Sequence, residues 1–382
     1  MASLASKRRG STIGGIGNAM RILLNITEEE LAFVGGDQKY YRTLLASKDN
    51  YPESQCTILK HSSTRLRNGV RQLEAVASHV SESSFRQRLF AQARRMPIFP
   101  GDLDVDIIFS TVLAARPLLK RNIAQVWYSQ GISPASYYED TGKFSITDVA
   151  ALYWLIAPHV SQIVVGTHDG TQRLQEMCPN LPCPITTIPQ VTFVNSHIDL
   201  KSKLMEEKVH FLFVGQDYKR KGLPEVLSAY RRICRNNTSC ELHIVTAKNC
   251  PLQKEAADLP DVFWHFNLFE EELEDLYCHC NVLLATTYAD TYNLVIVEAM
   301  AFGLAIISSN LAPLREIAPH DEVGLCVEPG DVDALALALD AMIEDTSRKR
   351  RYMRNSFERY ESIHAPDVLM PQLLDVFKQA IS

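Results

Sequence analysis

Short apolar runs alternate with longer segments of helical periodicity along most of the chain. In the first half the apolar runs lie at 21–26, 105–110, 125–128 and 162–166, and in the second half at 209–214, 241–245, 282–285 and 304–308. Each is short enough for a buried strand. Helical patterns between them include 224–233, with proline near its first turn, and 293–302, closed by Gly303. This alternation predicts parallel sheets covered by helices on both faces.

The strand–helix pattern breaks once, near the middle of the chain. Residues 187–200 lack it and are predicted to be a linker, after which the pattern restarts at Val209. A chain of 382 residues is also too long for one ordinary hydrophobic core. We therefore predict an α/β protein of two Rossmann-like domains facing a central cleft. Ligands of such open sheets bind at the carboxyl ends of the strands.

Composition narrows the class of protein. The 46% hydrophobic and 22% charged residues are typical of a globular protein, and a net charge of −6 argues against nucleic acid as a partner. The nine cysteines form no zinc-ligand or disulfide framework, which favours a reducing compartment. No apolar run has membrane-spanning length, and 1–19 lacks the apolar core of a signal peptide. We expect a cytoplasmic protein.

Two glycine-rich stretches lie near the start of the chain. The stretch 11–18 precedes the first strand, so it lacks the order strand, glycines, helix of a phosphate loop, and we predict that 1–19 is a flexible leader. Gly35 and Gly36 do follow a strand and precede a helical pattern, which is the productive order for binding an anion.

A basic segment at 65–95 stands apart from the acidic whole. It holds seven arginines against two glutamates, a local net charge of +5, and apolar residues recur in it at helical spacing. Such a helix suits the surface of an anionic membrane, at the inner face of a cell membrane. A solvated helical face is an equal alternative.

A cationic loop follows the first strand of the second domain. Gly215 ends that strand, and Lys219, Arg220 and Lys221 lie directly before a helix that begins near Leu223. Cations at the positive end of a helix dipole are electrostatically unfavourable. A bound anion makes the interaction favourable, because the cations and the free N–H groups both attract it. A solvated surface turn is the plainer interpretation. The preceding strand and Gly222 favour a diphosphate site.

Two carboxylates flank the start of the helix at 293–302. Asp290 follows the strand 282–285, Asn293 is placed to cap the helix, and Glu298 lies within it among apolar residues. A buried carboxylate needs a partner. One interpretation is a salt bridge to Arg315. The other is that Glu298 accepts hydrogen bonds from two sugar hydroxyls.

These motifs together resemble the group 1 retaining glycosyltransferases of GT-B fold. Over about 120 residues, 211–329, the chain follows the family pattern of a strand, glycine and a lysine–glycine pair. The family's Glu-x7-Glu signature appears as Asp290-x7-Glu298, followed by an Ala-Met-Ala-x-Gly run ending at Gly303. The N-terminal half matches only in layout, through Gly35 and Gly36 and the strand order.

The resemblance implies domains and roles. An acceptor domain would span 20–195, rejoined by a C-terminal helix at about 365–382, and a donor domain would span 205–360. Lys221 and Arg220 would hold the donor diphosphate, Asp290 would face the transferred sugar, and Glu298 would bind the ribose. The remaining substrate-binding residues implied are Asn293, Leu294, Val295, Gly215, Gly36 and Gln130. No metal ligands and no cofactor are expected, because cations and a helix N-terminus stabilise the leaving group.

Several positions depart from the family pattern. Asp290 is one methylene shorter than the usual glutamate, Gln216 stands where arginine is frequent, and Asn293 replaces a glycine. In the first domain Ser129 and Gln130 occupy the place of a frequent histidine. These departures blur the identity of the sugar.

The sequence leaves three functional classes open. The first is a retaining transferase that moves a sugar from a UDP- or GDP-sugar to a hydroxyl of a glycan, lipid-linked or small-molecule acceptor. The second is a non-catalytic sugar-nucleotide-binding relic of the same fold, suggested by the substitutions at 216, 290 and 293. An epimerase or phosphorylase on the same scaffold is the third and weakest, since no rich acid–base set or Schiff-base lysine is evident.

Overall fold

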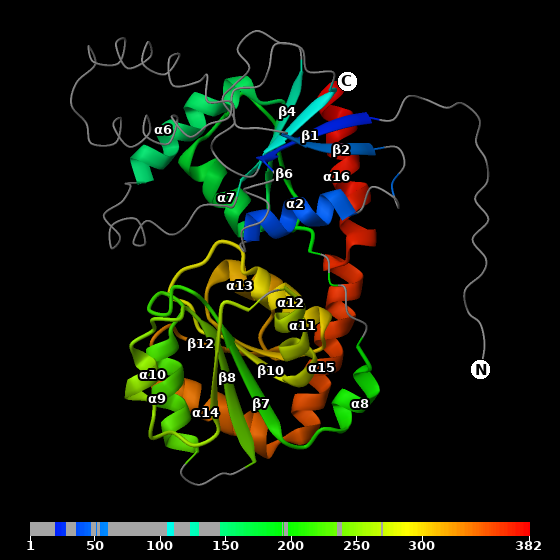
Figure 1. Ribbon diagram of the computed structural model, residues 1–382. Coiled ribbons are helices and arrows are strands. Elements are labelled where there is room, and N and C mark those ends of the chain that lie inside the picture. Colours follow the sequence, from blue (N-terminus) through cyan, green and yellow to red (C-terminus); the bar gives the residue numbers. More distant parts are fainter. Residues whose placement is uncertain are drawn as a thin grey trace, which may run out of the picture.

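The computed structural model describes residues 20–27, 36–46, 51, 54–59, 105–110, 123–129, 146–192, 194, 198–234, 239–268 and 270–382. The predicted leader 1–19, the basic segment 65–95 and Gln130 lie outside these residues. The described chain forms two α/β lobes, one above the other, each built around its own parallel sheet (Figure 1).

The N-terminal sheet has the strand order β2-β1-β3-β4-β5-β6, with every neighbouring pair parallel. Its strands are β1 (Met20–Thr27), β2 (Ser54–Leu59), β3 (Ile107–Ser110), β4 (Ala124–Ser129), β5 (Gln162–Val165) and β6 (Ile185–Thr187). Its described helices are α2 (Gly36–Ala46), α6 (Ile146–Ile156), the 3₁₀ turn η3 (Ala157–His159) and α7 (His168–Met177). Alternate residues of the central strands bury on opposite faces. Phe109 and Tyr128 pack with α2, while Trp127 and Ile163 pack with α6 and α7.

The C-terminal sheet has the order β12-β11-β10-β7-β8-β9, again with all pairs parallel. Its strands are β7 (Val209–Val214), β8 (Cys240–Thr246), β9 (Val262–Phe266), β10 (Val282–Ala285), β11 (Ala305–Ser309) and β12 (Gly324–Val327). The helices are α8 (Leu200–Met205), α9 (Leu223–Ile233), α10 (Leu252–Glu255), α11 (Glu270–His279), α12 (Leu294–Ala301), α13 (Ala312–Ile317), α14 (Val332–Glu344) and α15 (Thr346–Arg359). In β7, Phe211 and Phe213 face α9 and α14, while Leu212 faces α11 and α12.

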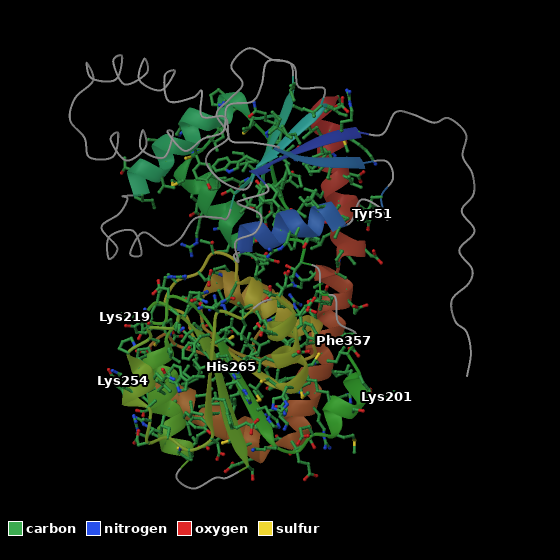
Figure 2. The ribbon with its side chains drawn as sticks, viewed as in Figure 1. Tyr51, Lys201, Lys219, Lys254, His265 and Phe357 are labelled. Atoms are coloured by element: carbon green, nitrogen blue, oxygen red, sulfur yellow. The ribbon has the colours of Figure 1, made fainter. Side chains whose placement is uncertain are left out.

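The chain returns to the first lobe at its end. A π-helical turn, η4 (Tyr360–His364), leads from α15 into α16 (Pro366–Ile381), which runs up beside the N-terminal sheet (Figure 1). Phe377 of α16 meets the ring of Phe109 edge-on at 5.5 Å, and Leu373 and Leu374 are fully buried in the same core. Tyr51 lies beside the start of this helix (Figure 2), with its hydroxyl 3.4 Å from Oδ1 of Asp367. The last helix therefore belongs to the core of the N-terminal lobe.

Two details of the predicted elements need correction. The linker expected over 187–200 is shorter, because Thr187 ends β6 and Leu200 begins α8. Asn293 does hold the N-cap position of α12, with extended backbone at φ −98° and ψ 94°, but its side chain caps no N–H group. Its buried Oδ1 has no hydrogen-bond partner within the part of the chain that the structure describes.

Candidate functional site

The loop between β7 and α9 folds back against the loop that follows β10. Gly222 makes this possible: its φ is +79°, a conformation that other residues rarely adopt, and an added Cβ would lie 2.2 Å from the carbonyl oxygen of Thr286. The hydroxyl of Thr287 donates to the carbonyl of Arg220 at 3.1 Å, and the N–H of Tyr288 donates to the same carbonyl at 2.8 Å. Both loops follow the carboxyl ends of neighbouring strands, where ligands of open sheets bind.

The three cations of the first loop have different surroundings. Lys219 is exposed and projects from the outer side of the lobe (Figure 2). Arg220 donates from Nη1 to the carbonyl of Ala289 at 2.8 Å and from Nε to Asp217 at 3.2 Å, so its guanidinium braces the two loops. Only Lys221 points its charge at the predicted site, with Nζ 2.6 Å from Oδ2 of Asp290.

Lys221 and Asp290 therefore form an ion pair across the two loops, although they lie 69 residues apart. Their side chains are 18% and 13% exposed, so the pair is mostly withdrawn from water. Gly215 passes directly behind it, since a Cβ there would come within 2.9 Å of Cγ of Lys221. The structure thus joins two residues to which the sequence assigned separate tasks.

The first turn of α12 lies next to this ion pair in the chain. Leu294 and Val295 begin the helix, and the first backbone N–H groups of any helix lack intrahelical acceptors. Asn293 is 4% exposed and its Oδ1 has no partner among the described residues. A cation, helix N–H groups and an amide oxygen without a partner are what a phosphorylated sugar requires.

Glu298 lies deeper, on the buried side of α12. It is 6% exposed, and its Oε2 accepts a hydrogen bond of 2.7 Å from the hydroxyl of Tyr277 in α11. Arg315, the cation considered as its partner, donates instead to Asn310 at 2.7 Å. Burial, followed by the charge of Glu298, raises the pKa of Tyr277 well above its usual value, so the phenol stays protonated and keeps donating.

The two lobes meet beside the site through residues that the sequence did not single out for binding. Glu316 of α13 accepts hydrogen bonds from the N–H groups of His168 and Asp169, at 2.7 and 3.1 Å, and so caps α7 of the other lobe. Tyr292, two residues after Asp290, packs so closely on Gly166 that an added Cβ would lie 2.9 Å from its ring. The close contact at Gly166 depends on the tertiary structure, so no local sequence pattern predicts it.

A cavity of about 370 Å³ opens between the lobes at this junction. Its walls include Gly166, Tyr292, Glu316, Arg359 and His364. Burial, assisted by the charge of Arg359, lowers the pKa of His364 to about 3, so its imidazole is neutral near pH 7. The cavity joins the donor-side loop 290–293 to the carboxyl end of β5. It is large enough for a small polar ligand.

Gly36 is the first residue of α2. This helix lies along the side of the upper lobe that faces the lower one (Figure 1). Burial of Tyr40 in α2, together with the nearby Tyr292, raises the pKa of Tyr40 well above its usual value. The start of α2 and the loop 290–293 therefore approach the same boundary between the lobes.

A second polar group, away from this site, has ligand atoms suited to a metal. His210, Glu241, His243 and His279 bring one such atom each to within 4.8 Å of one another. They lie near the amino ends of β7 and β8 and at the end of α11, the opposite edge of the sheet from Lys221. The sequence did not identify this group.

The described residues include no helix with the length and apolar character needed to cross a membrane.

The match to a known protein family lies in the C-terminal lobe. Residues 196–359 match the family "Glycosyl transferases group 1". Phosphatidyl-myo-inositol mannosyltransferase of Mycolicibacterium smegmatis is 26% identical over 296 residues, 74% of this chain and 72% of that one. The MMP alpha-(1->4)-mannosyltransferase of Mycolicibacterium hassiacum is 30% identical over 172 residues, 44% of this chain and 42% of that one.

Solved structures are similar over both lobes. Sucrose-phosphate synthase of Thermosynechococcus elongatus superposes with a TM-score of 0.71 at 17% identity, covering 94% of this chain and 98% of that one. Anabaena HepE in complex with UDP-glucose gives a TM-score of 0.65 at 14% identity, covering 94% and 99%. These likenesses confirm the predicted two-domain α/β architecture, which is the GT-B fold, and the family match assigns residues 196–359 to a group 1 glycosyltransferase domain.

Proposed function

We propose that this transferase moves a sugar from a nucleoside-diphosphate sugar to an acceptor hydroxyl with retention of the anomeric configuration. The observation that carries the proposal is the ion pair between Lys221 and Asp290 at the carboxyl ends of β7 and β10. The partner of Lys221, Asp290, lies three residues before the N-cap of α12, and Tyr292 of the same loop packs on Gly166 of the second lobe. HepE, which was solved with UDP-glucose, supports a nucleotide sugar as donor, and we propose a UDP- or GDP-sugar.

The donor diphosphate is proposed to take Lys221 as its cation. The negative oxygens of the diphosphate would bind the Lys221 ammonium together with Asp290. They would also accept hydrogen bonds from the backbone N–H groups of Leu294 and Val295. A preorganised cation and helix terminus in a mostly buried site stabilise charge that develops on the leaving diphosphate. No metal ion is needed for that task. Arg220 keeps the two loops together through Ala289 and acts on the donor through their position.

Asp290 and Glu298 are proposed to bind different parts of the sugar nucleotide. Asp290 would face the transferred sugar, where a carboxylate favours positive charge at the anomeric carbon. Glu298 would accept the ribose hydroxyls, with Tyr277 holding its other oxygen at 2.7 Å. The part of the chain that the structure describes offers no convincing nucleophile beside Asp290, so the departing diphosphate oxygen is proposed to take the acceptor proton on the same face of the sugar.

The acceptor is proposed to enter from the N-terminal lobe, near Gly36 and Gln130. It is a hydroxyl of a glycan, a lipid-linked molecule or a small molecule. The name of the Mycolicibacterium smegmatis relative, phosphatidyl-myo-inositol mannosyltransferase, favours testing a lipid acceptor. The basic segment 65–95 would then hold the enzyme at the anionic inner face of the membrane, where each Arg contributes roughly 1 kcal/mol.

Two experiments test this function. Calorimetric titration with UDP and GDP, followed by incubation with the sugar forms of the nucleotide that binds, measures donor hydrolysis without acceptor. Proton NMR, recorded before the released sugar mutarotates, then reports the anomeric configuration of the product. A non-catalytic binding protein would bind nucleotide but hydrolyse no donor, and an inverted product would overturn the retaining mechanism.

Sedimentation with anionic and neutral vesicles at low salt tests the segment 65–95, and equal sedimentation would refute membrane contact.

A further inference from the structure

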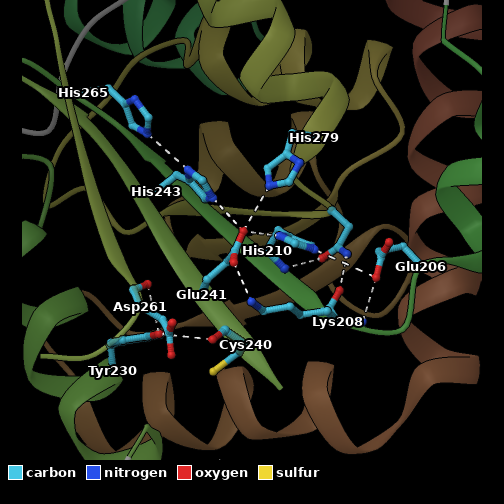
Figure 3. A network of polar contacts seen from close by, with 11 residues as sticks. Glu206, Lys208, His210, Tyr230, Cys240, Glu241, His243, Asp261, His265 and His279 are labelled. Carbon is cyan, nitrogen blue, oxygen red and sulfur yellow. Dashed lines mark hydrogen bonds and ion pairs between the residues drawn. The ribbon is translucent and has the colours of Figure 1, made fainter. Parts of the chain in front are cut away.

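Four side chains from three separate elements converge under α11. His210 in β7 pairs in register with Glu241 in β8, and His243 lies two residues further along β8, so all three point to the same face of the sheet. His279 is the last residue of α11, which covers that face. Figure 3 shows the three imidazoles directed at the Glu241 carboxylate.

The contacts concentrate on one oxygen. Oε1 of Glu241 lies 2.9 Å from Nε2 of His243 and 3.0 Å from Nε2 of His279, and it also contacts Nδ1 of His210. Oε2 of Glu241 accepts a hydrogen bond of 2.6 Å from Nζ of Lys208. A carboxylate oxygen has two lone pairs, so three imidazole donors on Oε1 exceed its ordinary capacity while Oε2 has room.

A cation among these atoms accounts for the arrangement. Three nitrogens and one oxygen make a common ligand set for zinc, with Zn–N and Zn–O distances of about 2.0–2.2 Å. Tetrahedral geometry at those lengths sets neighbouring ligand atoms roughly 3.3 Å apart. The distances of 2.9 and 3.0 Å are a few tenths of an ångström shorter, and all four ligand atoms lie within 4.8 Å of one another. Side-chain rotations that change these separations by up to about 1.5 Å bring the four atoms to tetrahedral spacing.

The surroundings suit a bound metal ion. His210, Glu241 and His243 are each 7% exposed, while the side chain of His279 is 49% exposed and leaves a route from solvent. If Nε2 of His243 is the ligand, Nδ1 carries the proton and donates to Nε2 of His265 at 3.1 Å, the outer hydrogen bond that orients a ligating imidazole (Figure 3).

We propose that His210, Glu241, His243 and His279 hold one zinc ion that fastens the end of α11 to the amino ends of β7 and β8. The role is structural, because the protein supplies all four ligands. The loops that carry Lys221 and Asp290 lie at the opposite end of the sheet, since they follow the carboxyl ends of β7 and β10. The zinc site is independent of the proposed transfer reaction. Metal content and nucleotide binding can therefore succeed or fail separately.

The first experiment measures metal in the full chain, purified without a histidine tag. Elemental analysis should find about one zinc per chain. Zinc removed by a chelator and then returned should raise Tm by about 4 °C or more. Cobalt in its place should give the visible absorption typical of a tetrahedral site. No bound zinc and no change in Tm with zinc would overturn the proposal.

A pair of variants separates metal binding from hydrogen bonding. His279→Gln keeps an N–H donor but is a poor zinc ligand, whereas His279→Cys supplies a thiolate ligand and removes that donor. We expect the first to lose the zinc and the zinc-dependent rise in Tm, and the second to keep both. His320→Gln, at an exposed histidine outside the group whose Nδ1 accepts the N–H of Cys326, should keep the zinc and the zinc-dependent rise in Tm. If Gln at 279 preserves stability and Cys does not, the group is a hydrogen-bonded carboxylate and the zinc site is refuted.

Discussion

Replacing Lys221 by Ala separates the effect on the donor from the effect on the fold. In the free protein the change leaves Asp290 with its backbone contact to Thr291, at 3.1 Å, but without its cation. Breaking a fully buried pair costs about 3–5 kcal/mol and an exposed one at most about 1 kcal/mol. With side chains 18% and 13% exposed, this pair lies between those limits. We expect a loss of about 1–2 kcal/mol and a fall in Tm of roughly 2–8 °C.

The effect on nucleotide binding should be larger. A hydrogen bond to a charged group contributes roughly 1.5–3 kcal/mol, which corresponds to a loss of about 10- to 150-fold in affinity for the nucleoside diphosphate. Asp290→Asn should act in the opposite direction on the bare diphosphate. It frees the ammonium and removes a nearby negative charge, so binding should tighten several-fold at low salt while turnover falls.

The measurement is calorimetric titration of each variant with UDP and with GDP at one fixed salt concentration. Lys219→Ala is the matched control, because Lys219 is an exposed cation of the same loop that projects from the outer side of the lobe. It should bind as the wild type does. The double variant at 221 and 290 should gain less affinity over Lys221→Ala than Asp290→Asn gains over the wild type, since only the loss of the negative charge then contributes. Unchanged affinity in Lys221→Ala, or an equal loss in Lys219→Ala, would refute the diphosphate assignment.

Three further changes test other parts of the site. Glu298→Gln should weaken the nucleoside diphosphate itself by about 10- to 100-fold, measured by titration with and without the sugar, because the ribose would lose a charged acceptor; wild-type affinity would contradict the ribose role. Gly222→Ala should lower the free energy of unfolding by at least about 1–3 kcal/mol, measured by urea denaturation, because its φ of +79° and the 2.2 Å approach to Thr286 both exclude a Cβ; an unchanged midpoint would show that the loop relaxes. Brief EDTA treatment at 25 °C should leave turnover intact, and activity lost on chelation and restored by Mg²⁺ or Mn²⁺ would count against the cation-and-helix mechanism.

The central strands of both sheets could be predicted because their signal is local. The run at 282–285 coincides with β10, and the predicted helix 293–302 brackets α12 by one residue at each end. The edge strands β2, β6, β9 and β12 were missed. β6 has three residues, and β9 is only partly buried, so neither shows a continuous apolar run. Edge strands are defined by their neighbours more than by their own side chains.

The candidate site was predictable residue by residue but not as an arrangement. The glycine and lysine of one loop and the two carboxylates of another matched a known pattern. Nothing local indicated that Lys221 and Asp290 would form a pair. The group of His210, Glu241, His243 and His279 was harder still to predict from the sequence. Only Glu241 and His243 share a strand, where alternate residues face the same side, and His210 and His279 reach them from other elements.

The loop 290–293 gives the site a physical link between the two lobes. Asp290 at one end holds Lys221, and Asn293 at the other begins α12. Between them Tyr292 packs on Gly166 of the opposite lobe, at the end of β5 where α7 starts. On the proposed function, a diphosphate that shares the Lys221 ammonium would weaken the contact that fixes one end of this loop. We therefore predict that the position of Tyr292, and with it the spacing of the lobes around the cavity, changes when a donor binds. An enzyme that must exclude water from a reactive sugar needs such a response, since only a closed cleft favours the acceptor hydroxyl over hydrolysis.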